Sequence, residues 1–165
     1  MHITQQYYQN KPSLFLMNTE QQEYISLISR STHDDILIKK TGWEAINFQE
    51  HAHEKFQIIY TLSGTLHVET GGVNYFVPEK HIAWIPEKAS HKLSSNSRQV
   101  SLIIFYINLN ITPDDGKNRF SIYSTNGIIA ENLKFIASKG KVITRGKQTD
   151  LYLSLIHISE PTRLQ

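Results

Sequence analysis

Short runs rich in Val, Ile, Tyr, Phe and Thr follow one another from Ala45 to Ile107, and turn residues separate them. Runs of this length and composition are typical of an all-β domain. Ser63-Gly64 marks one tight turn, and Gly71-Gly72 suits a two-residue hairpin because glycine accepts positive φ at both central positions. The pattern predicts strands at Ala45–Gln49, Phe56–Leu62, Thr65–Thr70, Val73–Val77, Ile82–Ile85 and Val100–Leu109.

The last of these runs, VSLIIFYINL, is apolar at both alternating sets of positions. A strand of this kind needs cover on both faces, by the opposite sheet on one side and by another element on the other. The segment GIIAENLKFIAS from Gly127 to Ser138 can provide that cover as a helix, because Ile129, Leu133 and Ile136 follow a 3.6-residue period. We therefore expect a β-domain followed by an α-helix.

The rest of the chain divides around this core. Residues 1–44 form an arm of mixed structure, in which EQQEYISLISR is compatible with a helix or a strand and DDILIKK with a short strand. The β-rich core takes residues 45–110, and a loop with a short strand takes residues 111–126. Residues 127–152 hold the helix, a basic connector and the start of a second helix capped by Thr149-Asp150.

We expect the C-terminal residues 153–165 to be a non-native tail. Residues 153–163 read LSLIHISEPTR, which resembles the translation of a sequencing adapter. We therefore leave His157 and its neighbours out of the functional reasoning, as for a fusion scar. The alternative is a native helix end, for which Leu151, Leu153, Leu155 and Ile156 are plausible core residues.

Composition limits the classes of protein to consider. The 165 residues contain 39% hydrophobic residues, which suffices for one domain with a core, and the net charge of +2 gives no argument for nucleic acid or a membrane surface. No Cys is present, so thiolate metal sites are excluded. The N-terminus lacks a signal-peptide pattern, and the longest apolar run is far below the ~20 residues of a membrane helix. We expect a soluble, cytoplasmic protein.

Two histidines separated by one residue suggest a site. In a strand, His51 and His53 point to the same side, Gln57 shares that side if the phase continues, and His91 can supply a third imidazole. Three imidazoles and an amide oxygen could hold a divalent metal ion such as Zn, Fe, Mn or Ni. The alternative is that these polar residues bind no metal and hydrogen-bond a small molecule, water or each other.

These residues resemble the two motifs of the cupins. HxH, an acidic residue and a glycine map onto His51, His53, Gln57 and Gly64, and the second motif maps onto KHIAWIPEKASH, ending at His91. The chain departs from the pattern where Gln57 replaces the acidic ligand and where Lys80 and Lys88 replace two glycines. An amide offers a metal only a dipole, so the loss of the carboxylate weakens such a site.

Within the cupins, the chain is similar to the sensory domain of AraC-type transcription regulators over about residues 45–107, and the helix that follows fits as well. The resemblance implies an all-β fold, the cupin-type double-stranded β-helix barrel or jelly roll, followed by a C-terminal α-helix. It also implies a small-molecule effector bound in the barrel, a homodimer made through the helices, and DNA contacted only through a C-terminal domain that is missing here. A gene cut short near Leu153 would produce such a chain.

Catalysis by the chain itself is not expected, because no Ser-His-Asp pattern, phosphate loop or paired carboxylates occur. His67 and His81 are expected at the surface or in hairpins. Aromatic residues such as Phe56 and Tyr75 are weaker ligand candidates, since an aromatic in a barrel is more often core. No cofactor is expected; the alternative is one divalent metal in a cupin oxygenase or isomerase, and a third possibility is a stand-alone binding cupin. The predicted effector-binding residues are His51, His53, Gln57, Tyr60, Trp84 and His91, and a metal, if present, would use His51, His53, Gln57 and His91.

Overall fold

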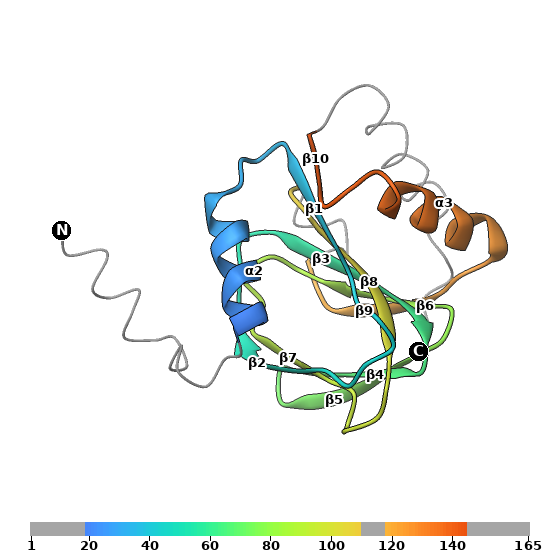
Figure 1. Cartoon of the computed structure of the whole chain (residues 1–165). Coiled ribbons are helices and arrows are strands. Elements are labelled where there is room, and N and C mark those ends of the chain that lie inside the picture. The colour runs from blue at the N-terminus through green and yellow to red at the C-terminus, as the bar shows by residue number, and fades with distance from the viewer. Residues whose placement is uncertain (1–18, 110–117, 145–165) are drawn as a thin grey trace.

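The computed structural model describes residues 19–109 and 118–144. In this part of the chain, ten strands form two antiparallel sheets that face each other, with one helix across an open end and another on the outside (Figure 1). The larger sheet has the order β10-β1-β8-β3-β6-β9 and the smaller sheet the order β2-β7-β4-β5. The predicted jelly-roll barrel followed by a helix is confirmed. The elements are α2 (Thr19–Arg30), β1 (Asp35–Lys40), β2 (Asn47–His51), β3 (Phe56–Ser63), β4 (Thr65–Thr70), β5 (Val73–Pro78), β6 (His81–Ile85), β7 (His91–Ser94), β8 (Ser101–Ile107), β9 (Ser121–Ser124), α3 (Gly127–Ala137) and β10 (Val142–Thr144).

The six-stranded sheet is covered on both faces, as VSLIIFYINL predicts. In β8, Ile104 and Tyr106 belong to the cluster between the two sheets, which we call the inner cluster. Ile103 and Phe105 belong to a second cluster on the opposite face, the outer cluster, which α3 covers. Because side chains alternate along a strand, one continuous apolar run fills both layers.

The predicted stripe of α3 packs against the outer cluster. Ile129, Leu133 and Ile136 are all buried there. The helix begins after Asn126, whose side chain accepts a hydrogen bond from the Ile129 backbone N–H, as an N-cap residue does. The helix ends at Ala137, close to the expected end.

The ambiguous arm segment is a helix. In α2, Gln21, Tyr24 and Ile28 lie at positions i, i+3 and i+7, so they share one side. Ile28 is part of the inner cluster and Tyr24 packs against it. Burial of this side therefore selects the helix from the two possibilities. None of the helices in the described part of the chain is long and apolar enough to cross a membrane.

Several short strands differ from the expected pattern. The β7 strand was not predicted, because its four residues carry a single large apolar side chain, Leu93. The basic connector holds β10, which pairs with β1 at the edge of the larger sheet. The second strand lies at Asn47–His51, two residues later than expected. The expected second helix at Thr149 and the tail from residue 153 lie outside the described residues.

Three of the turns with a left-handed backbone bear on the two motifs. Gly64 has a φ of 83°, and a Cβ there would lie 2.6 Å from the Gln99 carbonyl oxygen, so only glycine fits. Lys80 and Lys88 have φ values of 63° and 64°, and these are the positions where the cupin motif has glycine. Their backbone N–H groups donate to the carbonyls of Thr61 and His53. Both lysines therefore adopt the backbone conformation of the motif's glycines, at a free-energy cost of about 1 kcal/mol each.

Candidate ligand-binding site

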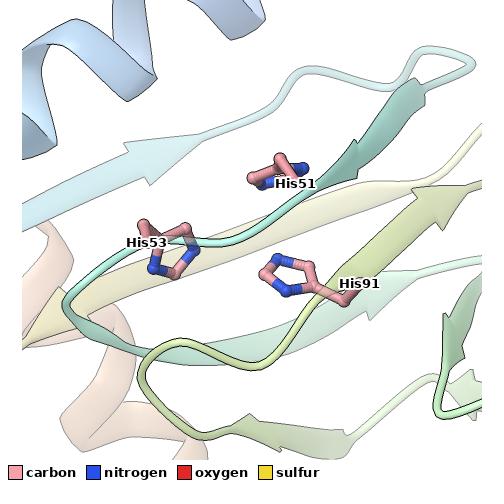
Figure 2. Close-up of side chains that lie close together, drawn as sticks. All are labelled: His51, His53 and His91. Carbon is pink, nitrogen blue, oxygen red and sulfur yellow. The ribbon is translucent and has the colours of Figure 1, made fainter. Parts of the chain in front are cut away.

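Three imidazoles meet at the end of the barrel that α2 covers. His51 ends β2, His53 lies in the loop after it, and His91 begins β7 (Figure 2). The β2–β7 pairing sets His51 opposite His91, and their ring centroids are 4.4 Å apart. The His53 ring lies 5.6 Å from that of His51 and 5.2 Å from that of His91. These distances show that the three rings converge as predicted. All three rings are also buried.

The backbone fixes the tautomer of each ring. The Nδ1 atoms of His51, His53 and His91 lie 2.7, 2.8 and 2.8 Å from the carbonyl oxygens of nearby backbone groups. A carbonyl can only accept, so each Nδ1 carries the proton and donates it. Each Nε2 is then left with a lone pair that can accept a proton or bind a metal.

Burial keeps the rings neutral. Desolvation, together with the neighbouring His51, lowers the pKa of His53 to about 4. Desolvation also holds the pKa of His91 well below its usual value and lowers that of His51. Neutral rings are what both a hydrogen-bonding ligand and a metal require.

Gln57 joins this group from β3. It is fully buried, its Oε1 lies 3.0 Å from His53 Nε2, and its Nε2 lies 3.5 Å from the Tyr106 hydroxyl. With His53 in the tautomer above, the first contact brings two acceptors together. Rotating the amide by 180° resolves the conflict, because its NH₂ then donates to His53 and its oxygen accepts from Tyr106. A cation bound to both atoms resolves it equally well.

The donor set also fits a metal ion. One ligand atom from each histidine lies within 4.8 Å of the others. His91 Nε2 is buried, and within residues 19–109 and 118–144 it has no hydrogen-bond partner. A buried polar atom without a partner is unfavourable unless a ligand uses it. His51, His53 and His91, with the Gln57 oxygen, could therefore hold a divalent cation.

Helix α2 closes this end of the barrel through Gln21. The Gln21 amide NH₂ donates to the Gln49 carbonyl at 2.9 Å, and its oxygen accepts from the Gln49 N–H at 3.0 Å. The same NH₂ lies 3.1 Å from His51 Nδ1, and because that nitrogen already donates to the Gln49 carbonyl, the two groups are only in packing contact. Sequence reasoning missed Gln21, although a polar residue on the apolar side of a possible helix with Tyr24 and Ile28 was a usable signal.

A cavity opens beside the imidazoles, between α2 and the loop that joins β2 to β3. Its volume of about 330 Å³ is at the lower end of the range for small-molecule sites. His53 and Lys55 line one side, and Ile25 and Ile28 of α2 line the other. The Lys55 ammonium is anchored by the carbonyls of Thr32 and Asp35 and by Asn108. The cavity therefore combines polar groups with an apolar wall.

Two predicted effector-binding residues lie elsewhere. Tyr60 and Trp84 belong to the outer cluster under α3, together with Phe56. Side-chain alternation explains this, because Gln57 points inward from β3 and Tyr60, three residues later, points outward. Grouping Tyr60 and Trp84 with the histidines was therefore wrong. Tyr75 packs on Phe120 with a centroid distance of 4.5 Å.

His67 and His81 lie outside the group formed by His51, His53 and His91, as expected from the sequence. The His67 ring packs on the exposed Phe76 in the β4–β5 hairpin. His81, the first residue of β6, has its Nδ1 next to the Glu79 carbonyl near the surface. Neither is among the residues that could hold a metal together with His51.

The sequence matches a family model over residues 41–124, and that model describes the AraC-like ligand binding domain. The chain belongs to this family. The matched region contains the three histidines, Gln57 and Tyr106. The family placement confirms the resemblance that the two motifs suggested. No curated protein matches the sequence.

Solved structures are similar in fold at low sequence identity. Fatty-acid-bound ToxT from Vibrio cholerae is 13% identical, with a TM-score of 0.51 over 78% of this chain and 55% of the ToxT chain. A cupin superfamily protein from Desulfitobacterium hafniense is 14% identical, with a TM-score of 0.40 over 47% of this chain and 72% of that chain. The chain thus spans about half the length of ToxT.

Proposed function

We propose that this chain is the small-molecule sensing and dimerisation domain of an AraC-type transcription regulator. The observation that carries the proposal is a buried group of neutral imidazoles, Gln57 and Tyr106 at a barrel mouth that a helix closes, in a domain of a ligand-binding family. The proposed role of the barrel mouth is ligand binding and not catalysis.

Sensing requires that the ligand favour one position of α2 over another. Gln21 connects α2 to the site, because it contacts both the β2 backbone and His51. A ligand that binds His51 at Nε2 and turns its ring would disturb this packing contact. Ligand binding would then shift α2 and change how the arm packs on the barrel.

The partners follow from the same proposal. We place the homodimer contact on α3, where Ile128 and Phe135 are 71% and 45% exposed while the opposite side of the helix is buried. DNA would be contacted by a separate domain of the parent protein. ToxT was solved with an unsaturated fatty acid bound, which supports a small organic effector for this chain.

The experiment titrates the parent regulator on its promoter with candidate effectors. It measures how DNA-binding affinity and dimer geometry change with each effector. Variants His91→Ala and Gln57→Ala should weaken the effector response, whereas His67→Ala, outside the site, should leave it unchanged. A response that no effector elicits, or that the His91 variant retains in full, would count against sensing at this site.

A metal-dependent cupin enzyme is the second candidate function. It is favoured by the ring nitrogens of three histidines within 4.8 Å of one another and by the unpartnered His91 Nε2. A divalent ion held by His51, His53, His91 and Gln57 would supply Lewis-acid or redox chemistry. Metal analysis of the purified protein separates the two, because stoichiometric Fe, Mn, Ni or Zn that is lost in His51→Ala favours the enzyme.

A further inference from the structure

Lys39 points into the space between the two sheets. Along β1, Ile36 and Ile38 belong to the outer cluster and Leu37 to the inner cluster, so Lys39 lies on the inner side. Its side chain is only 3% exposed. An apolar side chain of similar volume is often at least as stable in such a place. A buried cation in a ligand-binding barrel therefore needs a functional explanation.

The surroundings of Lys39 suit a cation but provide one anionic partner. Its Nζ lies 4.2 Å from the centroid of the Tyr24 ring and 4.4 Å from that of Phe48. Aromatic faces attract a cation. Glu20 Oε1 lies 2.7 Å from Nζ, although the orientation of the two groups is not that of a hydrogen bond.

Glu20 reaches this ammonium from the surface. It lies in the first turn of α2, and its side chain is 53% exposed. The carboxylate side of this ion pair is therefore open to solvent, and a carboxylate of another molecule can take the place of Glu20.

Lys39 is also connected to the histidine site. The Tyr24 ring, which lies against Lys39, is 6.1 Å from the Tyr106 ring, and the Tyr106 ring is 5.3 Å from that of His53. These aromatic faces lie between α2 and the sheet. They form a packed apolar layer between the ammonium and the imidazoles, and because Tyr106 is only 4% exposed, a ligand needs α2 to move before it can contact both rings.

We propose that the effector is a carboxylate with an apolar body, and that its carboxylate pairs with Lys39 in place of Glu20. The apolar body lies along Tyr24 and Tyr106. Loss of the Glu20 contact releases the first turn of α2, where Gln21 holds β2. The inference rests on the proposed sensing function and adds the chemical class of the ligand and the residue that selects it.

The test uses octanoate and 3-phenylpropionate, each paired with its alcohol, and calorimetry on the whole chain. At least one carboxylate should bind roughly tenfold or more tightly than its alcohol, as expected for one charge-assisted interaction. Lys39→Met should remove this preference. Thermal unfolding of the variant checks that it is folded. Glu20→Gln, which lacks the competing carboxylate, should bind the carboxylate more tightly than the wild type does.

Several results would overturn the proposal: equal binding of carboxylate and alcohol, full affinity in Lys39→Met, or no carboxylate binding to Glu20→Gln. Amide hydrogen exchange in residues 19–30 should rise with bound carboxylate, and unchanged exchange contradicts the replacement of Glu20. A neutral effector that binds the wild type and Lys39→Met equally well would contradict the carboxylate assignment. The sensing function would not be affected by that result. If octanoate binds at Lys39 but promoter binding by the parent protein does not change, the sensing function is contradicted and the carboxylate site stands.

Discussion

The two faces of the six-stranded sheet share the same strands but carry different kinds of side chain. Under α3, the outer cluster is closed by apolar residues such as Ile58 and Phe105. Under α2, the inner side places Gln57, Tyr106 and Lys39 among apolar neighbours. Buried polar groups are costly unless they have partners. The outer face therefore serves stability, and the inner face keeps less favourable groups that a ligand can use.

The largest expected effect is on the outer face. Phe105→Ala should lower the free energy of unfolding by about 3–5 kcal/mol, because a buried aromatic is replaced by a cavity. Urea unfolding measures this loss. Phe76→Ala, at an aromatic that is 62% exposed, should cost less than about 0.5 kcal/mol. Similar losses in the two variants would show that the outer cluster is not the stabilising layer.

The inner face should respond to acid. The pKa of His53 is lowered to about 4 in the folded protein, whereas the unfolded chain takes up this proton near pH 6.5. Stability is therefore full above pH 6.5 and falls between pH 6.5 and about 4. His53 alone should account for about 3 kcal/mol. His51 and His91 shift in the same direction.

Urea unfolding from pH 7.5 to 4, with a chelator present, measures this dependence. His53→Gln should flatten the curve, while His67→Gln, at a histidine outside the triad, should leave its slope alone. An unfolding free energy that stays level down to pH 4.5 would mean that the imidazoles are not buried as neutral groups.

The contact between α2 and the inner face can be broken at one residue. Gln21→Ala removes two hydrogen bonds to Gln49 and should cost about 1–2 kcal/mol. Amide exchange in residues 19–30 should rise, because α2 is less firmly held. Glu23→Ala, at an exposed position of the same helix, is the matched control. Equal exchange in both variants would argue that Gln21 does not hold the helix.

The smallest effect concerns the loop beside His53. Lys88→Gly should raise the unfolding free energy by up to about 1 kcal/mol, since glycine adopts a φ of 64° without the side-chain penalty. Lys80→Gly should behave alike. Thermal unfolding shows the shift, and a loss of stability in both variants would mean that the lysine side chains contribute more than the strained backbone costs.

Much of this architecture can be predicted from local pattern. The alternation in VSLIIFYINL predicts a strand with two buried faces, and the period of Ile129, Leu133 and Ile136 predicts the helix that covers one of them. Motif spacing brings in His91, 40 residues from His51 in the chain. Short elements such as β7 were missed because four residues carry too little periodic signal.

The sequence by itself determined the all-β class, the outer helix α3 and the pair His51 and His53, because repeat patterns along a chain decide which side chains share a face. Only the tertiary structure decided which faces meet. It moved Tyr60 and Trp84 to the outer cluster, brought Gln21 onto His51 across 30 residues, and enclosed Lys39 between Tyr24 and Phe48. These contacts join segments far apart in the chain, so local periodicity does not specify them.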